Sequence, residues 1–355
     1  MGSLFKKKVK LFILNQHGSV LRVFMVARRL ISRPQEIEKC ISIFSPSSLS
    51  RHKQQLKRAI RHDMYRHLIT PDEYFLYGFA EKSEAEKNEF VGDMERTILC
   101  SRMYNSNPVG LIFMDKMDTY RYFAHFFKRE VIEVASNHDF GRYEEFVMRH
   151  EEYMLKPSAA SRGEGIRKIK APKSKAEIEI SFREIILLGK SVIEEVIDQG
   201  EAMARLHPES VNTIRLATYC DGSDLKILAC FVKIGRGESV VDNGGAGGLL
   251  AAVDENTGVI TTPGRTEFGE VVSIHPDTGI VIEGYQIPDW NKLLELVDQL
   301  VRVLPEQKYV GWDLAYSASK GWLLVEGNSG GQFVGPQISM KQGIRSLVSE
   351  TFGSL

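Results

Sequence analysis

The stretch Trp322–Phe333, WLLVEGNSGGQF, joins an apolar run to two oxygen-bearing side chains and a turn of small residues. Glu326 and Asn328 stand two residues apart. Because strand side chains alternate between faces, both project from the same face of the predicted strand. A carboxylate beside an amide offers the oxygen ligands that a hard cation such as Mg²⁺ prefers. An isolated pair of this kind is weak evidence, so its meaning depends on what the rest of the chain supplies.

A second predicted strand, YVGWDLAY, precedes this stretch and is joined to it by the turn SASKG. If that turn is symmetric, Asp313 lies opposite Leu324, and Glu326 is its diagonal neighbour at a Cβ separation of about 7–8 Å. Acids on a strand face are often simply exposed to solvent, but these two interrupt apolar strands, where an unpaired charge is costly. We therefore predict that Asp313, Glu326 and Asn328 form one metal site.

The amino-acid composition limits the classes of function that the chain can have. The 355 residues are 43% hydrophobic and 26% charged, which is ordinary for a globular chain. Lys plus Arg and Asp plus Glu both number 46, and this balance argues against a nucleic-acid partner. The four cysteines are scattered; Cys220 and Cys230 flank the turn DGSD without facing each other, which favours a reduced, cytoplasmic setting.

The N-terminal stretches KKKVKLF (6–12) and RVFMVARRLISR (22–33) are basic and apolar. They offer a peripheral contact with anionic lipid, and the simpler alternative is a solvated helix face. No apolar run approaches the roughly 20 residues of a membrane span, and no signal peptide is expected at this end.

Residues 1–110 read as mainly helical. After them, residues 111–114 read as a short strand before a helix, and residues 211–220 and 225–234 read as a hairpin. Residues 289–305 have the apolar spacing of an amphipathic helix.

Lys156 ends a predicted strand and precedes a loop of small residues that includes Ser161, Gly163 and Gly165. The backbone N–H groups of such a loop can approach phosphate oxygens closely, and the lysine adds a cation. A flexible surface loop is the alternative.

Acidic residues follow the next strand, in VIEEVIDQGE. Glu194 and Glu195 lie at the end of this strand, and Glu201 follows Glu194 by seven residues. An extended backbone segment can hydrogen-bond an adenine, and a carboxylate can accept from a ribose. The alternative is a set of acids that stabilises a helix start.

Arg215, Lys233 and Arg236 flank the glycine loop that contains Asn243, Gly244 and Gly245. Basic side chains beside exposed amides suit developing negative charge. The alternative is a charged sheet edge.

The order of these features, from about Leu111 to Gln337, resembles the ATP-grasp superfamily. VNTIRLATYCDG and VDNGGAGGLLAAVDENTG are most similar to the sugar-transfer-associated ATP-grasp proteins. The resemblance implies an α+β fold in which two lobes, residues 111–190 and 191–345, clamp ATP after the helical N-terminal region.

By the same resemblance, Mg²⁺ is held by Asp313, Glu326 and Asn328, and the ATP phosphates by Lys156. The adenine hinge would be formed by Glu194, Glu195, Val196 and Ile197, and the ribose would be bound by Glu201. Lys116 would be the N-lobe lysine, although many members carry it four residues later, where this chain has Tyr120. The turn Ser329, Gly330 and Gly331 would present amides to a substrate carboxylate.

The implied reaction is carboxylate–amine ligation through an acyl phosphate, on a sugar, amino acid or peptide in polysaccharide or natural-product assembly. Arg215 would stabilise the transferred phosphoryl group. A kinase of a small hydroxylated substrate and a nucleotide-binding scaffold are the alternatives.

Overall fold

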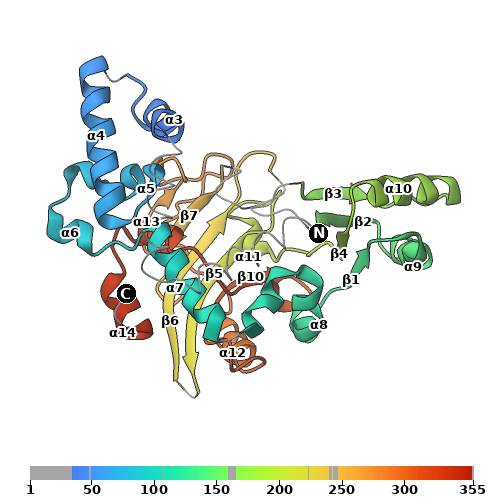
Figure 1. Cartoon of the computed structure of the whole chain (residues 1–355). Helices are drawn as coiled ribbons and strands as arrows, with labels where there is room; N and C mark the ends of the chain where they lie inside the picture. Colours follow the sequence, from blue (N-terminus) through green and yellow to red (C-terminus); the bar gives the residue numbers. More distant parts are fainter. Residues whose placement is uncertain are drawn as a thin grey trace.

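The computed structural model describes residues 34–47, 49–106, 108–158, 165–222, 224–239, 242 and 247–353. Two antiparallel sheets and their covering helices follow a helical N-terminal region, which confirms the expected α+β class (Figure 1). The basic stretches 6–12 and 22–33 lie outside the described residues. In the part of the chain that is described, no helix combines the length and apolar character needed to cross a membrane.

The small sheet has the strand order β1-β4-β2-β3. Its strands are β1 (Val131–Val134), β2 (Glu152–Pro157), β3 (Arg167–Lys170) and β4 (Ser191–Glu195). Tyr153 and Leu155 of β2 are buried under the helices α9 (Phe140–Arg149) and α10 (Lys175–Leu187). The alternating residues Met154 and Lys156 face the other way and line a cavity.

The large sheet has the order β11-β10-β5-β6-β7-β8-β9. Its strands are β5 (Thr213–Asp221), β6 (Asp224–Ile234), β7 (Leu249–Ala252), β8 (Gly264–Arg265), β9 (Val271–Val272), β10 (Tyr309–Ser317) and β11 (Gly321–Asn328). The predicted hairpin of β5 and β6 is confirmed. The four cysteines are free thiols.

The two faces of the large sheet have different neighbours. Ile214, Leu216 and Trp312 point to one face and pack with α8 (Lys116–Phe127) and α12 (Trp290–Val301). The predicted amphipathic helix is α12, whose residues Leu293, Leu296, Val297 and Leu300 are all buried at helical spacing.

The opposite face carries charged residues near the small sheet and apolar residues further away. Phe231 and Leu250 pack there with the N-terminal helices and with α13 (Val334–Met340). The remaining helices of the chain are α3 (Pro34–Phe44), α4 (Ser50–His67), α5 (Pro71–Leu76), η1 (Phe79–Glu81), α6 (Glu84–Asn88), α7 (Asp93–Ser106), η2 (Pro108–Met114), η3 (Asn137–Asp139), α11 (Glu201–Ala204) and α14 (Arg345–Phe352). Figure 1 shows α3 to α6 at the opposite end of the molecule from the small sheet.

Three sequence-based expectations need correction. Residues 111–114 belong to the 3₁₀ helix η2 and not to a strand. The small sheet includes β4, and so extends past the expected lobe boundary at residue 190. Finally, the β10–β11 hairpin is not symmetric: a bulge shifts the register, so that Glu326 lies directly opposite Asp313 and not diagonal to it.

Substitution of Gly343, near the C-terminus, tests how closely the N-terminal helical region packs against the C-terminal part of the chain. A Cβ added at Gly343 would lie 2.2 Å from the backbone C and O atoms of Glu89. We expect Gly343→Ala to lower the free energy of unfolding by about 1–3 kcal/mol or more, because backbone atoms must move. Gly141 in α9 has no atom within 4 Å of such a Cβ. Gly141→Ala should therefore be neutral or stabilising by roughly 0.5–1 kcal/mol. Urea unfolding measures both, and equal stability of the two variants would contradict the close docking.

Candidate active site

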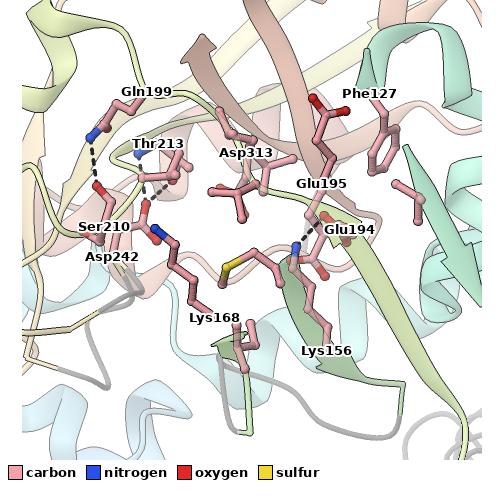
Figure 2. Close-up of a pocket in the computed structure, with 18 of the residues that line it drawn as sticks. Phe127, Lys156, Lys168, Glu194, Glu195, Gln199, Ser210, Thr213, Asp242 and Asp313 are labelled. Carbon is pink, nitrogen blue, oxygen red and sulfur yellow. Dashed lines mark hydrogen bonds and ion pairs between the residues drawn. The ribbon is translucent and has the colours of Figure 1, made fainter. Parts of the chain in front are cut away.

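A cavity of about 300 Å³ opens between the two sheets (Figure 2). Its walls come from the small sheet, from strands β5, β6, β10 and β11, from α8 and from the turn before β5. The predicted site residues that line it are Lys116, Lys156, Glu194, Glu195, Val196, Ile197, Lys233, Asp313 and Glu326. The topology therefore gathers residues from distant parts of the sequence into one place.

The large sheet contributes a row of charged side chains. Glu326, Asp313 and Arg215 are paired directly across β11, β10 and β5, so all three lie on one face. Arg215 binds both oxygens of Asp313, with Nε–Oδ1 2.5 Å and Nη2–Oδ2 2.6 Å, and Lys233 Nζ lies 2.8 Å from Oδ1. Burial alone would raise the pKa of Asp313, but Arg215 and Lys233 outweigh it and lower the pKa to about 2.

Arg215 does not itself line the cavity. Its guanidinium lies behind Asp313 and is occupied by that carboxylate. The geometry supports a positioning role, in which the planar guanidinium group fixes the orientation of Asp313. The contact between Arg215 and a transferred phosphoryl group, expected from the sequence, stays a prediction.

The small sheet contributes a second buried charge, Glu194. Its Oε2 accepts hydrogen bonds from Lys156 Nζ at 2.8 Å and from Arg129 Nη2 at 2.7 Å (Figure 2 draws the Lys156 contact). Burial raises the pKa of this carboxyl, but the charges of Lys156 and Arg129 prevail and lower it to about 2. The carboxylate of Glu194 is therefore an internal anion, and Lys156 retains further N–H donors for another partner.

Arg129 joins the two sheets. Besides binding Glu194, its Nη1 donates to the carbonyl of Leu324 at 2.6 Å and its Nη2 to that of Val325 at 3.3 Å. These carbonyls lie where the β11 register shifts. The arginine thus satisfies backbone acceptors at the bulge and fixes the bulged part of β11 relative to β4, next to Glu326.

The segment after β4 forms one end of the cavity. Among the residues that the structure describes, the backbone N–H groups of Val196 and Ile197 have no hydrogen-bond partner. The carboxylate of Glu195 is paired with Lys320 at 2.6 Å. The segment can therefore offer backbone N–H groups, rather than a free carboxylate, to a planar ring system.

Glu201 is exposed and does not line the cavity. Gln199 lines it instead, but its side-chain amide is used internally. The amide donates to the carbonyls of His207 and Ser210, and accepts from the N–H of Asn212 (Figure 2 draws the Ser210 contact). The exposed Glu209 also lines the cavity and is the nearest candidate for the role expected of Glu201.

The structure describes only part of each of the two predicted glycine loops. Ser161, Gly163, Asn243, Gly244 and Gly245 lie outside the described residues. The flanking Gly165 is exposed and has a φ of +73°, a conformation that favours glycine. It does not line the cavity.

Asp242, just before the second loop, is buried at the cavity wall. Its Oδ2 accepts from both the N–H and the hydroxyl of Thr213 (Figure 2). Burial raises the pKa of this carboxyl, while Lys233 opposes that effect. These two hydrogen bonds fix the side chain of Asp242 against the first residue of β5.

The remaining predicted residues lie off the cavity wall. Arg236 forms an ion pair with Glu270 at 2.9 Å near the surface. Asn328 is half-buried at the end of β11. In the turn that follows, the Ser329 hydroxyl donates to the carbonyl of Gly110, and Arg96 donates to that of Gly330. Gly331 is buried beside Tyr309.

The donor set fits a magnesium ion. Glu326 lines the cavity, and its carboxylate makes no hydrogen bond with another described residue. Each oxygen of Asp313 is already bound by a cation, but a carboxylate oxygen has a second acceptor site. Asn328 is two residues from Glu326 and on the same strand face. Glu326 therefore presents to the cavity a carboxylate without a described hydrogen-bond partner, with Asp313 directly opposite it and Asn328 two residues further along β11.

Sequence reasoning missed two residues of the cavity wall, Lys168 and Asp242, and the buried arginine Arg129, which joins the two sheets. Lys168 of β3 lines the wall, and its ion-pair partner among the described residues is Glu152, which is half-exposed. Arg129 precedes β1 in a run of charged residues that gives no hint of a buried arginine. Asp242 carried a usable signal, because it is an acid directly before a glycine loop.

The buried pair of Glu194 and Arg129 gives a prediction about stability and pH. Because the pKa of Glu194 is lower in the folded chain than its ordinary value of 4.5, its contribution is present above that value and is lost as the pH falls toward 2. We expect Glu194→Gln to lower the free energy of unfolding by about 3–5 kcal/mol near neutral pH. The difference from wild type should shrink steadily below about pH 4.5.

Glu195→Gln is the matched control, since Glu195 and its partner Lys320 are both partly exposed. It should cost about 1 kcal/mol or less. Urea unfolding of the three proteins at a series of pH values provides the measurement. If the difference in unfolding free energy between Glu194→Gln and wild type did not change with pH, the pKa of Glu194 in the folded chain would not be lowered by Lys156 and Arg129.

The family model for sugar-transfer associated ATP-grasp proteins matches residues 96–352. No curated protein matches the sequence. Among solved structures, D-alanyl-alanine synthetase A from Vibrio cholerae O1 biovar eltor str. N16961 aligns with a TM-score of 0.39 and 9% identity over 67% of this chain and 60% of that one. The D-alanine–D-alanine ligase from Helicobacter pylori aligns with a TM-score of 0.41 and 11% identity, over 68% and 61%.

The L-amino acid ligase from Bacillus licheniformis aligns at a TM-score of 0.37 and 11% identity, over 72% of this chain and 47% of that one. The chain thus spans less than two thirds of these structures, and scores this low do not by themselves establish a shared fold. The family match extends from α7 to α14 and includes both sheets, the cavity and its row of charges. The chain belongs to the sugar-transfer associated ATP-grasp family.

Proposed function

We propose that the protein is an ATP-dependent carboxylate–amine ligase that acts through an acyl phosphate. The observation that carries this proposal is the pair of acids Asp313 and Glu326 on one wall of the cavity, with the cations Lys156 and Lys233 beside it. This distribution suits a magnesium-bound triphosphate. The match to the sugar-transfer associated ATP-grasp family supports the same proposal.

The nucleotide would lie between the sheets. Val131, Met154 and Ile197 give apolar surface for the adenine, and the N–H groups after β4 offer hydrogen bonds to its edge. Lys156 and Lys168 project from the small sheet into the same cavity. Their ammonium groups would bind the phosphates, and Glu194 would keep Lys156 in place.

Bound Mg²⁺ supplies charge neutralisation of the triphosphate and orients its terminal phosphate. Asp313, Glu326 and Asn328 would hold it. Arg215 keeps the Asp313 carboxylate in one orientation through two hydrogen bonds. Lys233, which also contacts Asp313, extends from β6 to the cavity and would stabilise negative charge as it develops.

The reaction has two steps. A substrate carboxylate oxygen attacks the γ-phosphorus, the bond to the β–γ bridging oxygen breaks, and ADP leaves with that electron pair. An amine nitrogen then attacks the acyl carbon, inorganic phosphate leaves, and the amine proton passes to the solvent or the phosphate. The side chains act by positioning and charge stabilisation, so no side-chain nucleophile is needed.

The turn after β11 would bind the substrate carboxylate. Arg96 donates to the carbonyl of Gly330 at 2.7 Å. In a trans peptide the N–H of the next residue points the opposite way, so the N–H of Gly331 is directed away from Arg96. An N–H held in this way suits an anion, and its orientation depends on a residue of the N-terminal helical region.

The test is a screen of amino acids and aminosugars for ADP release with Mg²⁺-ATP. Release that requires both an acid and an amine supports ligation, and hydroxylamine trapping of the activated acid supports the acyl phosphate. Phosphate transferred to a hydroxyl group would show a kinase instead. Tight ATP binding without any turnover would indicate a nucleotide-binding scaffold.

Glu326→Gln is the sharpest single substitution. It keeps the size of the side chain and removes the charge, so we expect ADP release to fall by at least about 100-fold, as for loss of one charge-stabilising group. Stability should change by no more than about 0.5 kcal/mol, because no described residue donates a hydrogen bond to this carboxylate. The surface variant Glu295→Gln on α12 serves as control. Wild-type turnover by Glu326→Gln would remove Glu326 from the metal site.

A further inference from the structure

A second cluster of metal-ligating side chains lies in the N-terminal helical region, far from the cavity in the sequence. Asp63 and His67 stand four residues apart on α4, which places them on the same helix face. Glu84 comes from the start of α6. One ligand atom from each of these three residues lies within 4.8 Å of the other two.

His67 provides the independent observation. Its side chain is only 2% exposed, and its Nε2 is buried without a hydrogen-bond partner. The closest carboxylate oxygen, Oε2 of Glu84, is 3.6 Å away. The ring is held edge-on against Phe79, with centroids 5.5 Å apart and planes at 89°. Buried polar nitrogens almost always have a partner, so this one needs an explanation.

We propose that Asp63, His67 and Glu84 form a binding site for a divalent transition metal, with zinc as the best-fitting ion. One imidazole and two carboxylates are a ligand set that such ions accept, and water completes the coordination. Metal–ligand distances of about 2.0–2.2 Å place tetrahedral ligand atoms roughly 3.3–3.5 Å apart. The cluster must therefore contract by about 1 Å, which small side-chain rotations provide.

A lysine now occupies part of this space. Lys87 Nζ lies 2.9 Å from Asp63 Oδ2 and 3.5 Å from Glu84 Oε1, and Arg66 lies 2.6 Å from Glu84 Oε2. The two acids are therefore balanced by two cations. A divalent ion would take the place of the Lys87 ammonium group, whose long side chain is 13% exposed and can turn toward the solvent. Lys87 therefore competes with the metal for the two carboxylates, so its removal should strengthen metal binding.

The site would connect segments that are otherwise separate. Asp63 and His67 are in the last turn of α4, and Glu84 follows the aromatic segment that contains Phe79. A metal bound here fixes α6 against α4, and so stabilises the region that docks beside the turn of Ser329 to Gly331. The ion's role is structural and is independent of the ligase proposal.

The experiment uses the full chain without a histidine tag, with Mg²⁺ in excess so that the oxygen site at Asp313 and Glu326 does not bind zinc. Calorimetric titration with Zn²⁺ and native mass spectrometry should show one bound ion and a rise in Tm. His67→Asn should weaken zinc binding by at least about 100-fold, since loss of an outer contact alone costs 10–100-fold. Lys87→Met should strengthen binding, because it removes the competing cation.

Two further variants keep the test decisive. Glu84 is half-exposed, so Glu84→Gln should fold normally and also weaken zinc binding. His52 is an exposed histidine on the same helix, and His52→Asn should leave the affinity unchanged. Absence of zinc binding by the wild type would overturn the proposal. Equal affinity in folded Glu84→Gln and wild type, or weaker binding by Lys87→Met, would do the same.

Discussion

The buried contact between Arg129 and Glu194 is the constraint on which the rest of the site depends. A guanidinium group and a carboxylate that are both withdrawn from water must be fully bonded, because an uncompensated charge there costs several kcal/mol. The side chain of Arg129 is 1% exposed, and it meets this requirement by binding Glu194 on the small sheet and two carbonyls of β11 on the large one. The two sheets are thus fixed relative to each other at one end of the cavity, and the bulge that turns Glu326 toward Asp313 has its carbonyls satisfied.

In the large sheet, too, a buried charge is bound by charges of the opposite sign. Asp313 is buried in an apolar strand and is paired with two cations, Arg215 from the neighbouring strand β5 and Lys233 from β6, the strand beyond it. The carboxylate of Asp313 is therefore bound by two positively charged side chains of the protein itself. Glu326, which lacks such partners, is left as the open carboxylate at the cavity. The protein therefore keeps one acid in a fixed orientation and one free for a ligand, and both face the small-sheet lysines.

Much of this could be predicted from the sequence, for identifiable reasons. Strand alternation places Glu326 and Asn328 on one face, and turn residues mark the hairpins, so these local features were correct. The pairing of Glu326 with Asp313 could not be predicted, because the bulge has no turn signal in the sequence and its carbonyls are bound by Arg129, which is almost 200 residues away. The ion pair of Arg215 with Asp313 could not be predicted, since a strand pattern does not show which acid a buried charge meets. Spacing along the chain also does not show how the segment after β4 turns, and Glu201 lies off the cavity wall.

The central claim is that the space between the two sheets binds ATP, with the adenine against the segment after β4. Photolabelling with 8-azido-ATP in the presence of Mg²⁺, followed by peptide mapping, tests it directly. We predict that the label is found in peptides that contain Met154 or the pair Val196 and Ile197, and that excess ATP prevents it. Labelling confined to the N-terminal helices, or labelling of the cavity peptides that ATP does not reduce, would contradict the account.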